Sequence, residues 1–216
     1  MTGIITNETE WLQARLSGIG ASEASAILGH NPYMSNVDLW MIKTGRKKAP
    51  DISSNAHVEY GKKAEAPIRE LFALDYPEYE VTYGGEFDMV RNEKYPWLFA
   101  TLDGRLIERA TSKKGVYEGK TTEILRALAK EKWTDGVPQN YYIQLLHQLL
   151  ATGWDFAVLH AQLKRVFDGE IKSTRQSYRI EREEVKDDLE YLLEKEIKFR
   201  ECVEKDIMPA LILPEI

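Results

Sequence analysis

The sequence predicts a mixed α/β domain, and three observations lead to this fold class. Amphipathic helical segments fill the first third of the chain, strand-like segments begin near residue 80, and a long amphipathic helix closes the sequence. The 216 residues, 43% hydrophobic and 30% charged, suit one globular domain. We therefore expect a single domain over residues 1–216, with N-terminal helices at 8–75, a sheet with further helices at 80–182 and a C-terminal helix at 183–205.

Four helices are expected in the first third of the chain. They cover residues 8–16, 23–28, 36–44 and 56–75. Ser22 is a suitable N-cap for the second helix, and Gly29 and Gly45 are placed to end the second and the third. Pro67 lies inside the fourth segment and should kink or restart it, because proline lacks the amide hydrogen that a helix uses.

From residue 80 the hydrophobic pattern becomes that of strands, with glycines and charged residues at the turns. The expected strand-like segments are 81–90, 98–109, 115–122, 154–166 and 174–182. Two helical segments, at 123–132 and 137–151, separate the first three strands from the last two. In the second of these helices apolar residues recur at helical spacing, and Gly153 ends the pattern.

The cysteine and histidine content restricts the kinds of metal site that the chain can form. Cys202 is the only cysteine, which excludes an intramolecular disulfide as well as the zinc and iron–sulfur sites that need several thiolates. The four histidines show no HxxxH or HxH spacing. Any metal would therefore have to be held by carboxylates.

Hydropathy and charge also bear on the cellular setting. No apolar run approaches the length of a membrane span, and the N-terminus lacks the basic and hydrophobic blocks of a signal peptide, so we expect a cytosolic protein with no membrane partner. The net charge of −6 argues mildly against a nucleic-acid partner, because DNA-binding surfaces are basic. Whole-chain charge, however, says little about how the charges are distributed.

Two carboxylates and a lysine occur together in the predicted sheet. Glu118 and Lys120 are two residues apart on one expected strand, so their side chains leave the same face. Asp103 ends the preceding strand, where Gly104 permits a bend, and pairing of the two strands would bring all three side chains together. Carboxylates suit Mg²⁺, and a nearby lysine can orient water or offset transition-state charge, which together serve phosphodiester hydrolysis. Taken alone, the pattern is more often an ordinary exposed strand.

Four stretches in the chain, taken together, resemble a known family. In order they are RLSGIGASE (15–23), GKKAE (61–65) opening a helix, ATLDG with EGK (100–104 and 118–120), and YYIQLLHQLLATG (141–153). The pattern resembles the PD-(D/E)xK nuclease superfamily and, within it, the phage lambda exonuclease family, also called YqaJ-like viral recombinases. The resemblance covers residues 11–153 and implies a restriction-endonuclease-like core, in which helices flank a mixed central sheet.

The resemblance implies roles for the residues of the central motif. Lys120 would be the catalytic lysine, and Gln144 would order the nucleophilic water. Leu146 stands where relatives often have a second glutamine, so the role is assigned to Gln144 alone. Pro67, close to Glu65, is a departure from the family's helix and bears on the placement of that glutamate. The implied metal ligands are Asp103, Glu118, the Gly119 carbonyl and Glu65.

A second group of residues would bind the 5′-phosphate of DNA, by the same resemblance. The group consists of Arg15, Ser22, Thr101 and Arg126, with Thr101 standing where relatives have a serine. Ser22 at a helix N-terminus is a credible anion site, because free N–H groups and the helix dipole point toward the bound group. Arg15 just upstream could add a bidentate contact, although an ordinary solvated arginine is the simpler explanation without the resemblance.

The resemblance implies an exonuclease that uses Mg²⁺, with Mn²⁺ as the alternative and two ions in the site. It would degrade linear double-stranded DNA from 5′ to 3′ and leave 3′ overhangs for phage-type recombination. Expected partners are DNA ends, a single-strand annealing protein and two further copies of the chain in a homotrimer. The expected location is the cytoplasm of a bacterial host if the gene belongs to a phage or prophage. Two alternatives remain open, namely another PD-(D/E)xK nuclease of restriction or repair type and a catalytically idle DNA-binding module.

Overall fold

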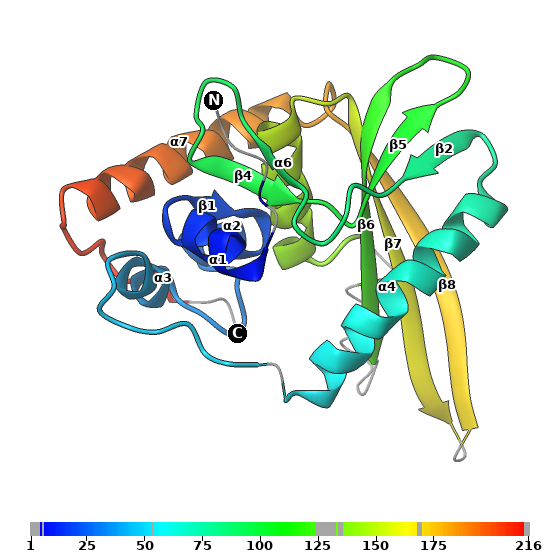
Figure 1. Ribbon diagram of the computed structural model, residues 1–216, viewed down its shortest axis with the longest axis horizontal. Helices are drawn as coiled ribbons and strands as arrows, with labels where there is room; N and C mark the ends of the chain where they lie inside the picture. Colours follow the sequence, from blue (N-terminus) through cyan, green and yellow to red (C-terminus); the bar gives the residue numbers. More distant parts are fainter. Residues whose placement is uncertain are drawn as a thin grey trace.

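The computed structural model describes residues 5, 7–52, 54–123, 133, 136–167 and 170–213. In this part of the chain the strands form two sheets (Figure 1). The smaller has the order β1 (Ile19–Gly20), β4 (Leu98–Thr101), β3 (Met89–Arg91). The larger has the order β2 (Tyr79–Thr82), β5 (Gly104–Glu108), β6 (Lys114–Glu123), β7 (Phe156–Phe167), β8 (Glu170–Glu181). Both sheets are mixed, because β1 is parallel to β4 and β6 is parallel to β7, whereas the other pairs are antiparallel.

Helices cover the two sheets. They are α1 (Glu8–Leu16), α2 (Ala21–Ile27), α3 (Asn36–Lys43), α4 (Ala56–Asp75), α6 (Gln139–Thr152) and α7 (Lys186–Glu204). Helix α6 contacts strands of both sheets as well as α2 and α7, whereas α4 packs on β2, β6 and β7 of the larger sheet (Figure 1). None of the described helices is long and apolar enough to cross a membrane.

The central strand β6 of the larger sheet is covered on both faces, by α6 on one and α4 on the other. Val116 of β6 packs in the cluster that contains Leu145 and Leu149 of α6. Its neighbour Tyr117 points the other way and meets Phe72 of α4, with ring centroids 5.0 Å apart. Since strand residues alternate between faces, the next positions along β6 must do the same, which sends residues 118 and 120 toward α6 and residue 119 toward α4.

The mixed α/β fold with helices around a mixed sheet is confirmed, but two expected strands are each divided. The segment 81–90 forms the end of β2 and the start of β3, with a loop at 83–88 between them. Gly85 adopts a positive φ of 107° in this loop, which a strand residue does not. The segment 98–109 forms β4 and β5, which belong to different sheets, and the chain crosses from one sheet to the other at Leu102 and Asp103.

Helix boundaries also differ from expectation in two places. The second helix begins at Ala21 rather than after Ser22, and Gly20 is its N-cap. Ser22 therefore lies in the first turn of α2 rather than at its N-cap, and the Glu23 carboxylate accepts the amide hydrogen of Gly20 at 2.8 Å. Pro67 neither ends nor restarts α4, which runs from residue 56 to 75. The helix expected at 123–132 lies outside the described residues except for its first, which ends β6.

Candidate active site

Asp103 lies at the junction of the two sheets. It follows β4 and immediately precedes β5, whose first residue Gly104 is paired with Tyr117 of β6. This register places Asp103 beside Glu118, as the sequence predicts. The Asp103 carboxylate accepts a hydrogen bond from the Gly119 amide at 2.9 Å, and its backbone carbonyl accepts one from Arg69 Nη1 at 2.7 Å. Helix α4, through Arg69, and strand β6 therefore fix the crossing point from both sides.

Glu118 is 2% exposed and is surrounded by donors. Lys120 Nζ and Gln144 Nε2 both lie 2.5 Å from its Oε1, and Gln148 Nε2 lies 2.5 Å from its Oε2. The lysine comes from the same face of β6, and the two glutamines come from successive turns of α6. Charge-assisted hydrogen bonds of this kind fix a buried carboxylate in both position and rotation. Gln144 therefore contacts the central carboxylate, together with a second glutamine that was not assigned a role.

The carboxylates of this site repel one another. Burial and then the charge of Glu118 raise the pKa of Asp103 to about 8, while Lys120 acts in the opposite direction. Burial also raises the pKa of Glu65, again against Lys120 and with a contribution from Glu118. For Lys120, burial would lower the pKa, but the charges of Glu118 and Asp103 outweigh it and raise the value. Three carboxylates thus lie close to Lys120, and Glu65 also feels the charges of Arg69 and Lys62, so hard oxygen donors are in excess at the site.

This excess of hard oxygen donors fits a divalent cation. Mg²⁺ is bound by carboxylates and carbonyls and usually shares its coordination with phosphates. Glu65, on α4, is half-buried and close enough to feel the charges of Glu118 and Lys120, so the intact helix does bring it toward the site. Among the described residues, however, no three His, Cys, Asp or Glu side chains converge as a ready-made ligand set. The ligand assignments of Asp103, Glu118, Gly119 and Glu65 stay predictions.

Three residues expected to bind a 5′-phosphate gather where α1, the start of α2 and the end of β4 meet. Arg15 Nη2 lies 3.5 Å from the Ser22 hydroxyl and 3.8 Å from Glu23 Oε1. Its guanidinium stacks on the Trp11 ring at 4.7 Å, and Trp11 Nε1 donates to the Thr101 hydroxyl at 3.0 Å. Three expected residues are thus joined through a tryptophan. Thr101 is the last residue of β4, two positions before Asp103. The fourth expected residue, Arg126, lies outside the described residues.

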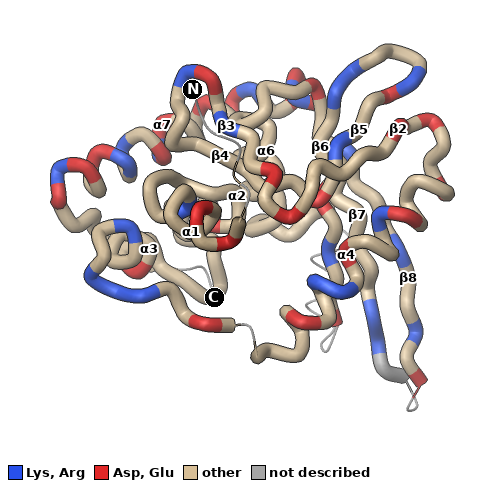
Figure 2. Tube along the Cα trace, in the orientation of Figure 1, with Lys and Arg blue, Asp and Glu red and all other residues tan. Residues whose placement is uncertain are grey.

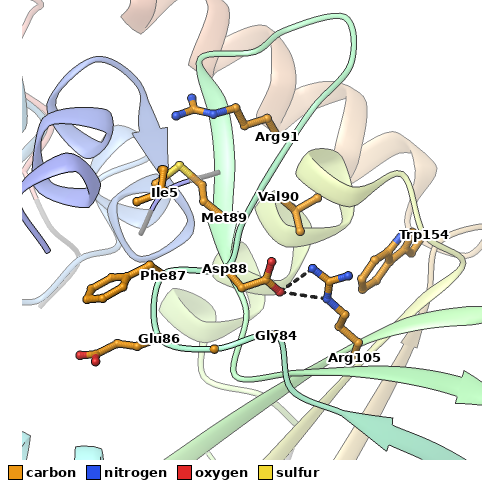
Figure 3. Close-up of a pocket in the computed structure, with 11 residues that line it drawn as sticks. Ile5, Gly84, Glu86, Phe87, Asp88, Met89, Val90, Arg91, Arg105 and Trp154 are labelled. Atoms are coloured by element: carbon orange, nitrogen blue, oxygen red, sulfur yellow. Dashed lines mark hydrogen bonds and ion pairs between the residues drawn. The ribbon is translucent and has the colours of Figure 1, made fainter. Parts of the chain in front are cut away.

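A cavity of about 600 Å³ lies beside β3 and the loop that precedes it (Figure 3). Its walls come from the 84–91 segment, Arg105 and Trp154, and Asp88 accepts hydrogen bonds from the Arg105 guanidinium across it. Met89 on its wall is the register partner of Thr101, and the neighbouring wall residue, Phe87, lies 6.3 Å from Trp11 between ring centroids. Two residues that line the cavity therefore lie next to Thr101 and Trp11.

Two contributors were missed or undervalued from the sequence alone. Gln148 was given no role from the sequence, yet it is fully buried and holds the second oxygen of Glu118. A polar pair at i and i+4 on an otherwise apolar helix is the signal that identifies it. Trp11 gave a similar signal, since it stands four residues before Arg15 on α1.

Comparisons with known proteins establish the family of this chain. The sequence profile of the YqaJ-like viral recombinase domain matches residues 10–155, more than half of the chain. This chain belongs to that family. The protein YqaJ of Bacillus subtilis (strain 168) is 29% identical over 152 residues, which cover 68% of this chain and 43% of that protein. The chain thus spans less than half the length of this relative.

Solved structures show the same fold at low sequence identity. The alkaline exonuclease LHK-Exo of Laribacter hongkongensis matches with a TM-score of 0.66 and 19% identity, over 93% of this chain and 94% of that one. A phage-related exonuclease from Haemophilus somnus 129PT matches with a TM-score of 0.59 and 12% identity, over 88% and 96%. The YqaJ-like domain of this chain therefore has the fold of these exonucleases.

Proposed function

We propose that this YqaJ-like domain is a Mg²⁺-dependent exonuclease that degrades linear double-stranded DNA from 5′ to 3′ and leaves 3′ single-stranded overhangs. The observation that carries the proposal is the meeting of Asp103, Glu118 and Lys120 where the two sheets join, beside the group formed by Arg15 and Thr101. A group that can bind a terminal phosphate, next to a centre that can hydrolyse a phosphodiester, suits an enzyme that works from a DNA end. The two structural neighbours are both exonucleases, which supports this reading.

The chain's own groups divide the chemistry between them. Asp103, Glu118, the Gly119 carbonyl and Glu65 are the proposed ligands of two Mg²⁺ ions, which Mn²⁺ can replace. When bound, the ions would polarise the scissile phosphate and favour formation of hydroxide from water. The Lys120 ammonium, kept charged by its carboxylate neighbours, offsets charge that develops on the phosphate in the transition state. Gln144 orders the attacking water, and Gln148 holds Glu118 in place.

The 5′ polarity is proposed from the group formed by Arg15, Ser22 and Thr101. A terminal phosphate carries more charge than an internal diester, so it gains more from a guanidinium and hydroxyl donors. Arg15, Ser22 and Thr101 supply these groups, and Arg126 is proposed as a further cation. Thr101 is separated from Asp103 by one residue, so a phosphate held at this group leaves the adjoining diester within reach of the junction.

A path for the duplex is proposed along the basic side of the molecule. Although the chain has a net charge of −6, Lys and Arg residues lie along the distal parts of β7 and β8 and, among acidic residues, on α4 (Figure 2). They include Lys62, Lys63, Lys164 and Arg175. Phosphate contacts by such side chains supply most of the sequence-independent affinity for DNA.

Assembly and cellular partners complete the proposal. We place the enzyme in the cytoplasm, that of a bacterial host if the gene is carried by a phage or prophage. A homotrimer that encircles the duplex would retain the substrate between cuts, and the amphipathic, acidic α7 offers a surface for subunit contacts. The 3′ overhang would pass to a single-strand annealing protein, as in phage-type recombination.

The proposal is tested by the substrate and strand requirements of cleavage. Linear duplex labelled at one 5′ or one 3′ end, and closed circular duplex of the same sequence, are incubated with the protein in Mg²⁺ or in EDTA. Loss of the 5′ label first, on linear DNA and only with Mg²⁺, is the expected result. Lys120→Ala should reduce the rate by a factor of about 100 or more, whereas Lys114→Ala, an exposed lysine on the same strand, should not. Cutting of the closed circle would indicate an endonuclease, and binding without cleavage an idle module.

A further inference from the structure

Helix α6 carries a third buried polar side chain beside the two glutamines. His147 lies between Gln144 and Gln148 in sequence and is 0% exposed. Its Nε2 lies 2.9 Å from the carbonyl oxygen of Phe99 in β4, and its Nδ1 lies 2.6 Å from Glu196 Oε1 in α7. Glu196 is also 0% exposed, and its second oxygen has no hydrogen-bond partner among the described residues. Both ring nitrogens are thus engaged by elements other than α6.

The bonding pattern defines the state of this pair. A carbonyl oxygen can only accept, so Nε2 carries a hydrogen and donates to Phe99. One proton then lies between Nδ1 and the glutamate. Burial alone would lower the pKa of His147, but the negative charge of Glu196 and the hydrogen bond to it outweigh burial and raise the pKa. The raised pKa of His147 favours an imidazolium that faces the Glu196 carboxylate in the core.

Stability is a poor explanation for such a pair. Desolvation of two ions offsets most of their attraction, and replacing a buried ion pair by apolar residues of similar volume is often neutral or stabilising. What apolar residues cannot supply is direction. An apolar helix face can slide or rotate by small amounts on its neighbours, whereas two short hydrogen bonds on one ring fix both the rotation and the axial position of α6.

We infer that His147, held by Glu196, is a positioning residue that sets α6 against β4 and α7, so that Gln144 and Gln148 meet Glu118 while β4 leads into Asp103 at the same place. The Phe99 carbonyl lies on β4, two residues before Thr101 and four before the aspartate. Through α6, the strand that carries one half of the site is thereby tied to Glu118 on β6. This inference rests on the proposed function in that Glu118 and Asp103 are its catalytic pair.

The decisive test is the double variant His147→Leu/Glu196→Leu, which replaces the pair by apolar side chains. We expect it to fold with a melting temperature near that of the wild type and to bind linear duplex with little change in KM. Its kcat should fall by about tenfold to a hundredfold, because a misplacement of about 1 Å in a catalytic group costs up to that much. A folded double variant with wild-type kcat would overturn the inference.

Two further variants keep the test sharp. In Glu196→Gln the side-chain amide can donate to Nδ1 of a neutral imidazole, whose Nε2 still donates to the Phe99 carbonyl. Both hydrogen bonds of the ring are then kept while the two charges are removed. We therefore expect this variant to retain most of the wild-type rate. Loss of rate in Glu196→Gln equal to that of the double variant would contradict a role in direction. His160→Leu replaces another buried histidine, which bonds Ser177 and faces α4, and it should leave kcat unchanged. If the double variant does not fold, Glu196→Gln and His160→Leu decide the matter.

An activity-independent measurement separates this inference from the proposed function. In a crystal structure of the double variant, or of Glu196→Gln if the former does not fold, the distances from the two glutamine amides to Glu118 are compared with 2.5 Å in the parent. Displaced amides in the double variant, or retained amides in Glu196→Gln, support the inference. The opposite result in either variant refutes it. A wild-type protein that fails to cleave DNA would refute the proposed function and leave this comparison intact.

Discussion

Asp103 should make the metal-free protein less stable than its asparagine variant at alkaline pH. Burial and the charge of Glu118 raise the pKa of Asp103 from 3.8 to about 8. An acid whose pKa is raised in the folded state stabilises the fold below its unfolded pKa and loses that contribution as the pH rises toward the folded value. The carboxylate therefore lowers the free energy of unfolding progressively between about pH 4 and pH 8. Asp103→Asn removes this charge, and its amide oxygen can still accept from Gly119.

The size of the effect follows from the shift in pKa. A difference of about 4 units corresponds to an upper limit of ~6 kcal/mol. Since side chains and water relax around a buried charge, we expect ~2–3 kcal/mol at pH 8. For a domain of this length that is an increase in Tm of about 5–10 °C. Asp103→Asn should at the same time be inactive. Loss of activity in a variant that is more stable than the wild type cannot be caused by unfolding.

Thermal melts in EDTA from pH 5 to pH 8.5 measure this directly. The advantage of Asp103→Asn over the wild type should grow with pH and level off above about pH 8. Asp155→Asn is the matched control, because the exposed Asp155 also accepts a backbone amide hydrogen, that of Lys114, at 2.8 Å. Added Mg²⁺ should raise the Tm of the wild type and not that of Asp103→Asn. An asparagine variant that is no more stable than the wild type at pH 8 would refute the electrostatic account of the site.

Three other predictions concern the surroundings of the junction. Arg15→Ala should slow digestion of 5′-phosphorylated ends by about tenfold to a hundredfold, to the rate of 5′-hydroxyl ends. The control variant Arg46→Ala should not. A preference for 5′-phosphorylated ends that persists in Arg15→Ala would overturn the proposed polarity. Gln148→Leu should lower kcat by about tenfold, because Glu118 loses a charge-assisted donor, and unchanged single-turnover rates would count against this role. Glu65→Gln should raise the Mg²⁺ concentration needed for half-maximal rate, and an unaltered Mg²⁺ titration would remove Glu65 from the ligands.

The sequence predicts the elements of the fold well where local chemistry decides them. Gly29, Gly45 and Gly153 end helices and adopt positive φ, as expected of glycine at these positions. A bend at Asp103 was expected from Gly104, but nothing in the sequence indicated that the two parts of the 98–109 segment belong to different sheets. Only the packing of α6 between the sheets shows that the chain changes sheets there.

The residues of the candidate site likewise divide into those that local sequence predicts and those that only the packed fold reveals. Glu118 and Lys120 share a face because alternate residues of a strand point to the same side, so their spacing in the sequence was enough to predict it. The capping role of Ser22 was wrong because α2 already begins at Ala21, which makes Gly20 the N-cap and places Ser22 inside the first turn. The His147–Glu196 pair joins residues 49 positions apart, and no local pattern indicates such a contact. Long-range polar contacts of this kind become visible only when α6, α7 and β4 are packed together.

The central claim is that Asp103 and Glu118 hold a divalent metal beside Lys120. Crystals of the protein soaked in Mn²⁺ and measured at the manganese absorption edge test it most directly, because anomalous scattering locates the ion independently of activity. The account predicts a manganese peak within ligand distance of Asp103 and Glu118, absent from crystals of Asp103→Asn treated in the same way. A wild-type crystal whose manganese lies only elsewhere, in a preparation that cleaves linear duplex with Mn²⁺, would contradict the account.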